Sequence, residues 1–551
     1  MPTNGRDGGS TRFIFVTGGV MSGLGKGIAA ASIGRLLKGL GATVAPVKMD
    51  PYLNVDAGTI GPFQHGEVWV TEDGGEIDMD LGHYERFLHQ DVPRDHNITA
   101  GQIWQAVIEK ERRGEYLGQT VQIIPHITDE IRRRLQVVAD RSKPDAVIAE
   151  LGGTVGDIES EAFLEAARQV AQAHRDRVLF VHVTLVPEGH GGEQKTKPTQ
   201  HSVAELRARG IQPDVIIART DSTLAPESRS KIALFCQVAP EQVISGPTVS
   251  NIYRVPLVFE EEGLGRILAE RLKLKGKGGG LADWRRVVEE MDGAEREVTI
   301  AMAGKYVAMA DSYISLNEAL KHAAASLGAR VKIHYVNTEE VERDPAALAS
   351  LAGVGGVLVP GGFGGRGAEG KIRTIQFARE RGVPYLGLCF GFQLAVVEFA
   401  RNAAGLKKAH TTEIDPKTPY PVVDILEHLR QARMGGTMRL GAQPVKLRPD
   451  TRARTIYGGQ EIILERHRHR YEVNPRFIPA LEQAGLVFSG LSPDGRMEAI
   501  ELPGPYFFMA TQYHPEFKSR PGAPAPVFKA FLQAALKSGG GVHKPQGAGS
   551  G

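Results

Sequence analysis

Residues 12–27 read Arg12-Phe-Ile-Phe-Val-Thr-Gly-Gly-Val-Met-Ser-Gly-Leu-Gly-Lys-Gly27, and this stretch decides the fold of the first half of the chain. It begins with a short apolar run that predicts a buried strand. A glycine-rich turn follows, after which the pattern predicts a helix over 27–40 and a second strand over 42–47. Because strand, turn, helix and strand in this order form a βαβ unit, we expect a parallel sheet.

The glycine-rich turn is a candidate phosphate-binding loop. Backbone N–H groups of such a loop and the helix N-terminus hold phosphate oxygens, and Lys26 would add a positive charge. The match to a P-loop is imperfect, because Val20 stands where the pattern has glycine and Gly27 replaces the usual magnesium-binding Ser or Thr. We favour a nucleotide site over an ordinary βα turn, since the loop follows the first strand and ends in a Gly-Lys pair.

Carboxylates must hold magnesium if Gly27 cannot. Glu150 ends an apolar strand predicted over 146–150, and ligands of parallel sheets bind at such strand ends. Asp80 is a second oxygen donor of the kind that suits Mg²⁺, although its spacing alone favours a solvated acidic loop. The segment 195–202 could grip a triphosphate, but its composition fits an exposed polar loop equally well.

The second half contains a candidate nucleophile. Cys389 lies in Gly387-Leu-Cys389-Phe-Gly391, after an apolar run and before a helix predicted over 390–402. Strand, sharp turn and helix form a nucleophile elbow, and the flanking glycines remove Cβ atoms that would block the turn. A buried structural cysteine is the commoner alternative, and Cys236, inside an apolar run, fits it better.

His514 and Glu516 are the expected partners of Cys389. They follow an apolar strand predicted over 506–513, and residues i and i+2 of an extended segment share one face. The imidazole would then act as the base and the carboxylate would orient it. Thiol, imidazole and carboxylate together predict an acyl-transfer triad.

Length and composition restrict the class of protein. A chain of 551 residues should hold about two to four domains. A net charge of +2 does not indicate nucleic acid as a partner, and two cysteines exclude a disulfide framework. No apolar run reaches the roughly 18 residues that span a bilayer, and no signal peptide is recognisable. We expect a cytoplasmic enzyme without a membrane partner.

The predicted fold class is α/β, with two doubly wound, mostly parallel-sheet domains. A basic, glycine-rich stretch over 273–280 indicates a linker, and a new α/β pattern begins near residue 298. The predicted division is a flexible tail over 1–11, a first domain over 12–272, a linker over 273–297, a second domain over 298–537 and a flexible tail over 538–551.

Taken together, these residues resemble the CTP synthase family over nearly the whole chain. The most specific matches, beyond the loop at 18–27, are segments 48–56, 64–68, 81–87, 111–118, 152–160, 195–202, 435–441 and 465–471. The resemblance implies a P-loop-like synthetase (amidoligase) domain followed by a class I glutamine amidotransferase domain. It implies a ligase that aminates UTP to CTP with ATP and L-glutamine, Mg²⁺ as metal, GTP as allosteric activator, CTP as feedback inhibitor, and a homotetramer that could form filaments.

The resemblance also assigns roles to individual residues. Nucleotide contacts would come from Ser22, Gly23, Leu24, Gly25, Lys26, Gly27, Lys48, Asp80, Asp157, Ile158, Glu159, Lys195, Thr196, Lys197, Pro198, Thr199, Gln200 and Lys231. Glutamine contacts would come from Gly362, Phe390, Gly391, Phe392, Gln393, Glu413 and Arg470. Asp80 and Glu150 would hold Mg²⁺. Residues 435–441 would form a lid linked to GTP activation, and Pro62, His65 and Val68 would line a passage for ammonia.

Some positions depart from the common family pattern. Gly23 stands where many members have Ser, and Phe390 and Phe392 stand where Leu and Met are frequent. The segment 186–192 differs from the usual Val-Pro-Tyr stretch, so the detail of the pyrimidine pocket is not carried over. Two alternatives have less support. A different fused amidotransferase-ligase acting on a carboxylate is disfavoured by segment 195–202, and a non-catalytic, filament-forming or regulatory relative is disfavoured by the intact triad and Lys26.

Overall fold

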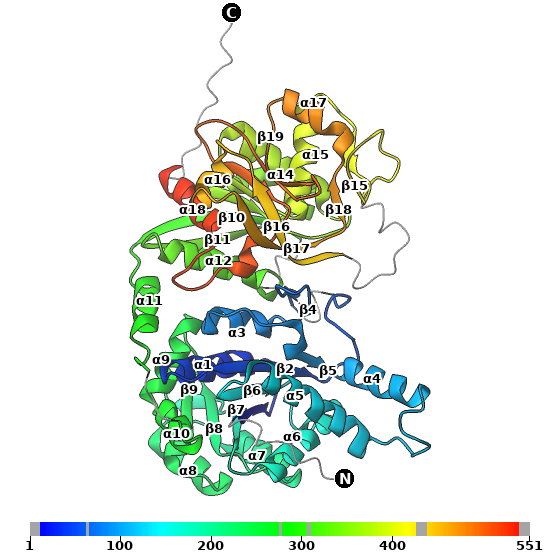
Figure 1. Ribbon diagram of the computed structural model, residues 1–551. Coiled ribbons are helices and arrows are strands. Elements are labelled where there is room, and N and C mark those ends of the chain that lie inside the picture. The colour runs from blue at the N-terminus through cyan, green and yellow to red at the C-terminus, as the bar shows by residue number, and fades with distance from the viewer. Residues whose placement is uncertain (1–10, 62–65, 275–277, 306–309, 426–437, 539–551) are drawn as a thin grey trace, which may run out of the picture. The chain divides into compact units, whose positions relative to one another are not determined.

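The computed structural model describes residues 11–61, 66–274, 278–305, 310–425 and 438–538. The chain divides into two compact units (Figure 1). Unit 1 consists of Met1–Ala57 and Ile77–Val288, and unit 2 of Gly58–Glu76 and Glu289–Gly551. The second unit therefore takes an internal segment, 58–76, from what the sequence predicts to be the first domain.

The helices and strands of unit 1 have these bounds: β1 (Arg12–Gly18), α1 (Lys26–Gly39), β2 (Val44–Asp50), α3 (Asp80–Leu88), η1 (Arg94–His96), β5 (Asn97–Thr99), α4 (Ala100–Arg112), η2 (Ile123–Ile127), α5 (Thr128–Ser142), β6 (Ala146–Leu151), η3 (Ile158–Ser160), α6 (Glu161–Ala173), β7 (Val178–Leu185), η4 (His190–Gly192), α7 (Lys197–Ala208), β8 (Val215–Thr220), α8 (Pro226–Cys236), η5 (Pro240–Gln242), β9 (Val243–Pro247), η6 (Ile252–Arg254), α9 (Val255–Glu261), α10 (Leu264–Arg271) and α11 (Ala282–Asp292), which extends past the boundary.

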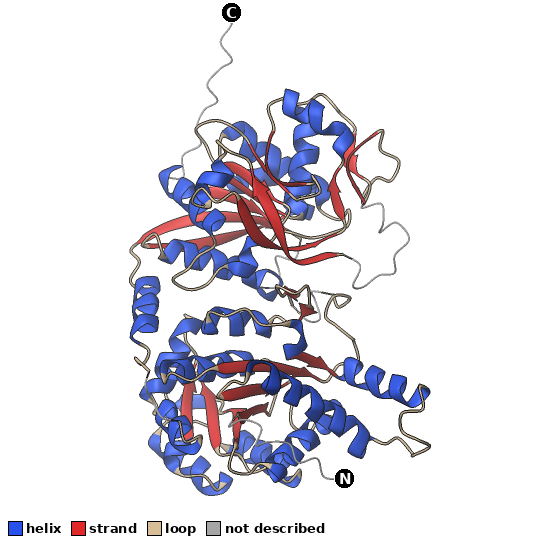
Figure 2. Ribbon diagram, viewed as in Figure 1, coloured by secondary structure: helices blue, strands red, loops and turns tan. Residues whose placement is uncertain are grey.

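The sheet of unit 1 follows the order β5-β2-β6-β1-β7-β8-β9, and all of its described pairings are parallel. Helices cover both faces, as Figure 2 shows. On one face α1 packs closely, because Gly34 has no Cβ, which would lie 2.7 Å from Leu88 Cδ2. On the other face Phe15 and Val47 are buried under α4, α5 and α6. This is the doubly wound architecture expected from residues 12–47.

The predicted linker contains a packed helix. Trp284 of α11 is fully buried and donates its indole N–H to the Tyr253 carbonyl at 2.8 Å. Its ring also contacts Phe87, with centroids 5.4 Å apart. The amphipathic segment after the glycines is thus anchored to unit 1, and the boundary between the units falls inside α11. Residues 275–277 of the glycine-rich stretch lie outside the described ranges.

The elements of unit 2 have these bounds: β3 (Trp69–Val70), β4 (Glu76–Ile77), which ends in unit 1, β10 (Arg296–Gly304), η7 (Ala310–Tyr313), α12 (Ile314–Ala325), β11 (Ala329–Asn337), α13 (Thr338–Arg343), η8 (Pro345–Leu351), β12 (Gly356–Val359), α14 (Ala368–Arg381), β13 (Tyr385–Leu388), α15 (Phe390–Asn402), β14 (Ala409–Thr411), β15 (Tyr420–Ile425), β16 (Arg439–Leu447), α16 (Arg452–Ile456), β17 (Ile462–His469), β18 (Tyr471–Val473), η10 (Pro475–Phe477), α17 (Ile478–Gln483), β19 (Val487–Leu491), β20 (Met497–Glu501), β21 (Phe508–Thr511), η11 (Pro515–Lys518) and α18 (Pro526–Ser538).

The main sheet of unit 2 is half parallel and half antiparallel. Its order among the described residues is β11-β10-β12-β13-β21-β20-β19-β16-β17. The strands from β11 to β21 pair in parallel, whereas those from β21 to β17 pair antiparallel. The parallel half carries the elbow that the sequence predicts. The antiparallel half was not predicted, and it brings β17 to the same sheet.

The structure also reports on two broader predictions. Cys236 is fully buried in a small apolar cluster, and burial raises the pKa of its thiol to about 11, in agreement with a structural role. Within the described ranges, no helix has both the length and the apolar character needed to cross a bilayer.

Candidate active sites

Cys389 occupies a strained turn at the C-terminal end of β13. Its φ is +50° and its ψ is −100°, and its N–H donates to the Thr511 carbonyl of β21 at 2.7 Å. Gly391 must follow, because a Cβ at that position would lie 2.2 Å from the Val359 carbonyl oxygen. Strain of this kind persists only where the surrounding structure enforces it, and here it presents the thiol beyond the strand end. The predicted nucleophile elbow is present.

His514 and Glu516 form the contact that the triad requires. His514 Nδ1 donates to Glu516 Oε1 at 2.7 Å, and both side chains are buried. The expected reason for this contact is wrong: β21 ends at Thr511, and Glu516 lies in the 3-10 helix η11, for which His514 is the N-cap. A tight turn, and not a shared face of an extended strand, joins the two groups.

Electrostatics favours the charged form of this histidine. Burial by itself would lower the pKa of His514, but the Glu516 carboxylate and Cys389 outweigh burial and raise it to about 10. The carboxylate also fixes the tautomer, because Nδ1 carries the bonded proton. His514 Nε2 makes no hydrogen bond to any described residue, so this nitrogen remains available to the Cys389 thiol.

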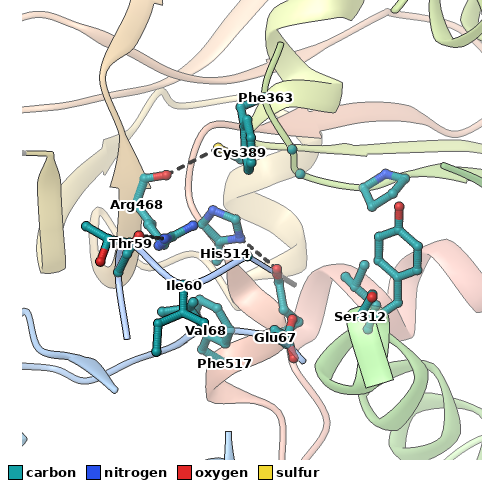
Figure 3. Close-up of a pocket in the computed structure, with 18 residues that line it drawn as sticks. Thr59, Ile60, Glu67, Val68, Ser312, Phe363, Cys389, Arg468, His514 and Phe517 are labelled. Atoms are coloured by element: carbon teal, nitrogen blue, oxygen red, sulfur yellow. Dashed lines mark hydrogen bonds and ion pairs between the residues drawn. The ribbon is translucent and has the colours of Figure 1, made fainter. Parts of the chain in front are cut away.

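The thiol itself lies between two polar groups. Cys389 Sγ donates to the Arg468 carbonyl of β17 at 3.6 Å (Figure 3). The Gln512 amide nitrogen lies 3.7 Å from the same sulfur. β17 belongs to the antiparallel half of the sheet, so this half helps to position the nucleophile. Neither Arg468 nor Gln512 was expected from the sequence.

A cavity of about 230 Å³ connects the triad with the segment taken from the first half of the chain. Its lining includes Cys389, His514 and Glu516 together with Gly58–Gly61, Glu67 and Val68. Figure 3 labels Cys389 and His514 among these residues, with Thr59, Ile60, Glu67 and Val68. Its remaining lining residues are Ser312, Tyr313, Leu316, Pro360, Gly361, Gly362, Phe363, Arg468 and Phe517. Val68 was predicted to line an ammonia passage; Pro62 and His65 lie outside the described residues.

Two arginines of β17 bind residues 70–76 to the rest of unit 2. Arg466, fully buried, donates to Glu72 Oε1 at 2.8 Å and to the Val70 carbonyl at 3.0 Å. Arg468 donates to Glu76 Oε1 at 2.8 Å. Buried arginine pairs of this kind hold a loop in one place, since breaking either partner leaves a charge without compensation.

A glycine loop and a buried lysine adjoin Cys389. Gly361 faces the triad, because a Cβ there would lie 3.2 Å from His514 Cε1. Gly362, at φ +156°, approaches Lys371 Nζ and the Phe390 ring in the same way. Lys371 is almost fully buried and donates to the Pro360 carbonyl at 3.0 Å. Burial lowers the pKa of Lys371 to about 7. Nothing in the sequence pattern indicates that Lys371 lies beside Cys389.

The predicted glutamine-binding residues surround the elbow on more than one side. Glu413 accepts the Gly364 N–H at 2.6 Å, and burial raises its pKa, while Arg470, half-buried, acts to lower it. Gln393 donates to the Tyr471 carbonyl at 2.9 Å. Phe392 is buried in the hydrophobic core, so its side chain is structural. Within this set, Glu413 and Arg470 are the pair suited to the charged ends of an amino acid.

In unit 1, Lys48 is the centre of a charged cluster. Its Nζ contacts Asp80 Oδ2 and Glu150 Oε1, the latter at 2.8 Å. Burial raises the pKa of Glu150 to about 7, whereas for Asp80 the charge of Lys48 overcomes burial and holds the pKa at about 2. The two predicted magnesium ligands thus converge on one point. Tyr84, which donates to Glu150 Oε2, was not predicted.

The phosphate loop has an unusual backbone. Val20 adopts φ +78°, a left-handed conformation that costs a β-branched residue energy, at the position where a P-loop has glycine. Lys26 donates to the Gly153 carbonyl at 2.7 Å, and burial lowers its pKa. Gly27 is required, because a Cβ there would lie 2.1 Å from Asp80 Oδ1. The loop therefore adjoins the carboxylates directly.

The other predicted nucleotide contacts lie in the loops after the strands of unit 1 and in the helices α7 and α8. Asp157, Ile158 and Glu159 are exposed after β6, and Asp157 accepts the Thr154 N–H at 2.8 Å. Lys195, Lys197 and Lys231 are exposed as well. Of the remaining predicted contacts, Thr196, Thr199 and Gln200 are buried, Pro198 is half-buried, Ser22 and Gly23 are exposed, Leu24 is buried and Gly25 is half-buried. Lys195 pairs with Glu193 at 2.6 Å, and Lys197 lies at the start of α7 with its Nζ over the Phe235 ring. Exposed lysines beside a helix N-terminus suit an anionic ligand.

Comparison with known proteins identifies relatives over both units. Residues 12–274 match the family described as "CTP synthase N-terminus", and residues 308–534 match "Glutamine amidotransferase class-I". A protein named CTP synthase from Pyrococcus furiosus is 58% identical over 530 residues, covering 95% of this chain and 98% of that relative. A CTP synthase from Archaeoglobus fulgidus is 55% identical, covering 96% and 98%. The glutaminase domain of Trypanosoma brucei CTPS with bound acivicin is 40% identical at a TM-score of 0.42, covering 44% of this chain and 94% of that one.

Proposed function

Since this chain belongs to the CTP synthase family, we propose that it aminates UTP to CTP at the expense of ATP, with ammonia released from L-glutamine at Cys389. The observation that carries the proposal is the elbow cysteine sharing one cavity with the 2.7 Å His514–Glu516 pair. A family relative that had lost activity would have no need to keep this geometry.

Hydrolysis of glutamine begins with attack of the Cys389 sulfur on the side-chain amide carbon. The raised pKa of His514 favours a thiolate–imidazolium pair, in which His514 already holds the proton of Cys389. His514 then donates this proton to the departing nitrogen, so ammonia leaves and a thioester remains. Water then cleaves the thioester to glutamate and regenerates the thiol. The N–H of Phe390 and the backbone of Gly361 and Gly362 support the proposed oxyanion site, because glycines permit close approach.

Amination takes place at the nucleotide site of unit 1. The terminal phosphoryl group of ATP passes to the 4-oxygen of UTP, and Lys26 and Lys48 neutralise its charge. Ammonia attacks C4 and phosphate departs. Asp80 and Glu150 would hold Mg²⁺, which supplies further positive charge to the phosphates; their convergence on the Lys48 ammonium supports this, since it marks a point that attracts a cation.

Transfer of ammonia and regulation belong to the same proposal. Water would protonate free ammonia to unreactive ammonium, so we propose a shielded route that begins in the cavity lined by the triad, Gly58–Gly61, Glu67 and Val68. CTP inhibition at Asp157–Glu159, GTP activation with the lid at 435–441, a homotetramer and a cytoplasmic location follow from the family resemblance. Residues 435–437 of that lid lie outside the described ranges.

One experiment tests the division of labour. Cys389→Ala should abolish CTP formation from glutamine and leave CTP formation from added ammonium chloride close to the wild-type rate. Formation of CTP is followed by its ultraviolet absorbance. Loss of both reactions would contradict the assignment of Cys389 to the glutaminase step alone, and retention of both would contradict its role as nucleophile.

A further inference from the structure

Three buried side chains in the antiparallel half of unit 2 form a cluster that the proposed reaction does not use. His467 and His469 lie on β17, two residues apart, and therefore on one face of the strand. Glu498 comes from β20. His467 and Glu498 are fully buried and His469 is 4% exposed. Because these side chains are buried, water does not solvate their polar atoms, and they need polar partners inside the protein.

The spacing of their ligand atoms suits a tetrahedral metal ion. His467 Nδ1 lies 3.1 Å from His469 Nε2 and 3.6 Å from Glu498 Oε2. One potential ligand atom from each residue lies within 4.8 Å of the other two. Metal–nitrogen bonds of about 2.1 Å in tetrahedral geometry separate neighbouring ligand atoms by roughly 3.4 Å. The two distances from His467 Nδ1 bracket that value.

A second contact prepares His469 for this role. Its Nδ1 donates to the Tyr471 carbonyl at 3.2 Å, which places the proton on Nδ1 and leaves a lone pair on Nε2. A backbone carbonyl behind the non-coordinating nitrogen is the usual support for a metal-bound histidine. Burial lowers the pKa of both histidines well below the usual value, so both are neutral, as ligands must be.

The Glu498 carboxylate has one oxygen paired with an arginine and one without a hydrogen bond in the described structure. Arg439 Nη1 contacts Glu498 Oε1, whereas Oε2 is buried and makes no hydrogen bond in the described structure. His467 Nε2 is buried without a hydrogen bond as well. A buried carboxylate oxygen without a partner is costly, and a cation beside it would remove the cost. Arg439 would then act behind the carboxylate, on the oxygen that faces away from the ion.

We propose that His467 Nδ1, His469 Nε2 and Glu498 Oε2 bind one divalent transition-metal ion of the zinc class. Binding displaces the proton that joins the two histidines, and this proton moves from Nδ1 to Nε2 of His467. Two imidazoles and one carboxylate favour zinc-like ions over Mg²⁺, which prefers oxygen ligands such as Asp80 and Glu150. The alternative is that no ion binds and that the two histidines keep the hydrogen bond between them.

Cobalt(II) is the probe, because its visible absorbance reports tetrahedral coordination. The full chain, treated with a chelator and dialysed, is titrated with Co²⁺ in excess Mg²⁺. A Cys389→Ser background removes the Cys389 thiol as a competing metal ligand. We expect one equivalent of Co²⁺ with intense visible bands, displaced by Zn²⁺. His469→Ala and Glu498→Gln should each weaken binding at least tenfold. The matched control His410→Ala, a buried histidine beside Glu369 in the same unit, should bind normally.

The outcomes separate the two readings. Absence of stoichiometric binding, or binding that survives both His469→Ala and Glu498→Gln, would overturn the proposal. If those variants do not fold, anomalous scattering from zinc-soaked wild-type crystals decides: a peak between the three ligand atoms supports the site, and its absence rejects it. Because the readout is metal binding, failure here leaves the proposed CTP synthesis untouched.

Discussion

Gly27 and Asp80 touch so closely that no side chain fits between them: a Cβ on residue 27 would lie 2.1 Å from Asp80 Oδ1. This contact explains the departure from the P-loop pattern at position 27. A common P-loop places a hydroxyl there to hold magnesium, whereas here the space belongs to a carboxylate. The phosphate loop and the proposed magnesium ligand therefore constrain each other.

Gly27→Ala should strongly reduce nucleotide-dependent activity. The added methyl must push Asp80 away from the loop, so we expect CTP formation from ammonia to fall at least tenfold while glutamine hydrolysis at Cys389 persists. Steady-state rates of the two half-reactions measure this. The control is Gly265→Ala in α10, whose Cβ would meet nothing nearer than 3.8 Å and which should leave both rates unchanged. Equal loss in both variants would mean that the contact is unimportant.

Lys371→Met should make the protein more stable and less active. The folded state lowers the pKa of Lys371 to about 7, so protonating it opposes folding, and this cost is greatest below pH 7 and vanishes above about pH 10.5. Methionine removes the cost but also removes the donor to Pro360, so the rate of glutamine hydrolysis should fall about tenfold. Melting temperatures at pH 6 and glutaminase rates measure the two effects. The exposed Lys332→Met should change neither.

Glu516→Gln should remove a pH dependence of stability. The pKa of His514 is raised to about 10 in the folded state, so the stability contributed by its charged form is complete below about pH 6.5 and is lost as pH rises toward 10. Without the carboxylate that pKa falls. The difference in melting temperature between wild type and variant should therefore shrink steadily from pH 6.5 to 10. A constant difference over that range would contradict the assignment.

Glu72→Gln should loosen the segment 58–76. It weakens the ion pair with the buried Arg466 and leaves that charge less compensated. Amide hydrogen exchange in 58–76 should become faster, and less CTP should form for each glutamine hydrolysed. Glu482→Gln is the matched control, because it disrupts a half-exposed pair with Arg448 in the same unit. Exposed pairs contribute little, so exchange should stay unchanged there.

Val20→Gly tests the strain in the phosphate loop. Valine at φ +78° costs energy of about 1–2 kcal/mol, which glycine avoids. Glycine also makes the unfolded chain more flexible by up to about 1 kcal/mol, so the net effect should be neutral to stabilising. The exposed Val55, without a positive φ, should lose about 1 kcal/mol on the same change. Urea unfolding of the two variants compares them directly.

Local patterns were sufficient to predict much of the architecture. The apolar run at 12–17 became β1, and the helix expected over 390–402 became α15. The loop after β1 leads to Lys26 at the start of α1, and the turn between β13 and α15 carries Cys389. These predictions succeeded because a buried parallel strand and the helix after it need a particular composition at nearby positions.

Local sequence patterns did not predict the packing between residues far apart in the chain. Glu72 and Glu76 pair with Arg466 and Arg468, which lie almost four hundred positions further along the chain. A local sequence pattern does not reveal a contact over that separation. The antiparallel strands β16 to β20 carry polar and charged residues whose burial depends on partners such as Arg439 and Glu498. Trp284, within the stretch predicted as a linker, contacts Phe87 far upstream, and the local sequence does not indicate this contact.

The order of residues along the chain thus determined which chemical groups exist and which turns present them: a cysteine between glycines, a lysine after a glycine-rich loop. Only the tertiary structure decided what surrounds them. It set the carbonyl that accepts the Cys389 thiol, the carboxylate against Gly27, and the charges that move the pKa of Lys371 and His514. The reason is physical: local conformation depends on neighbouring residues, whereas burial and electrostatic fields arise from groups that meet only after the chain has folded.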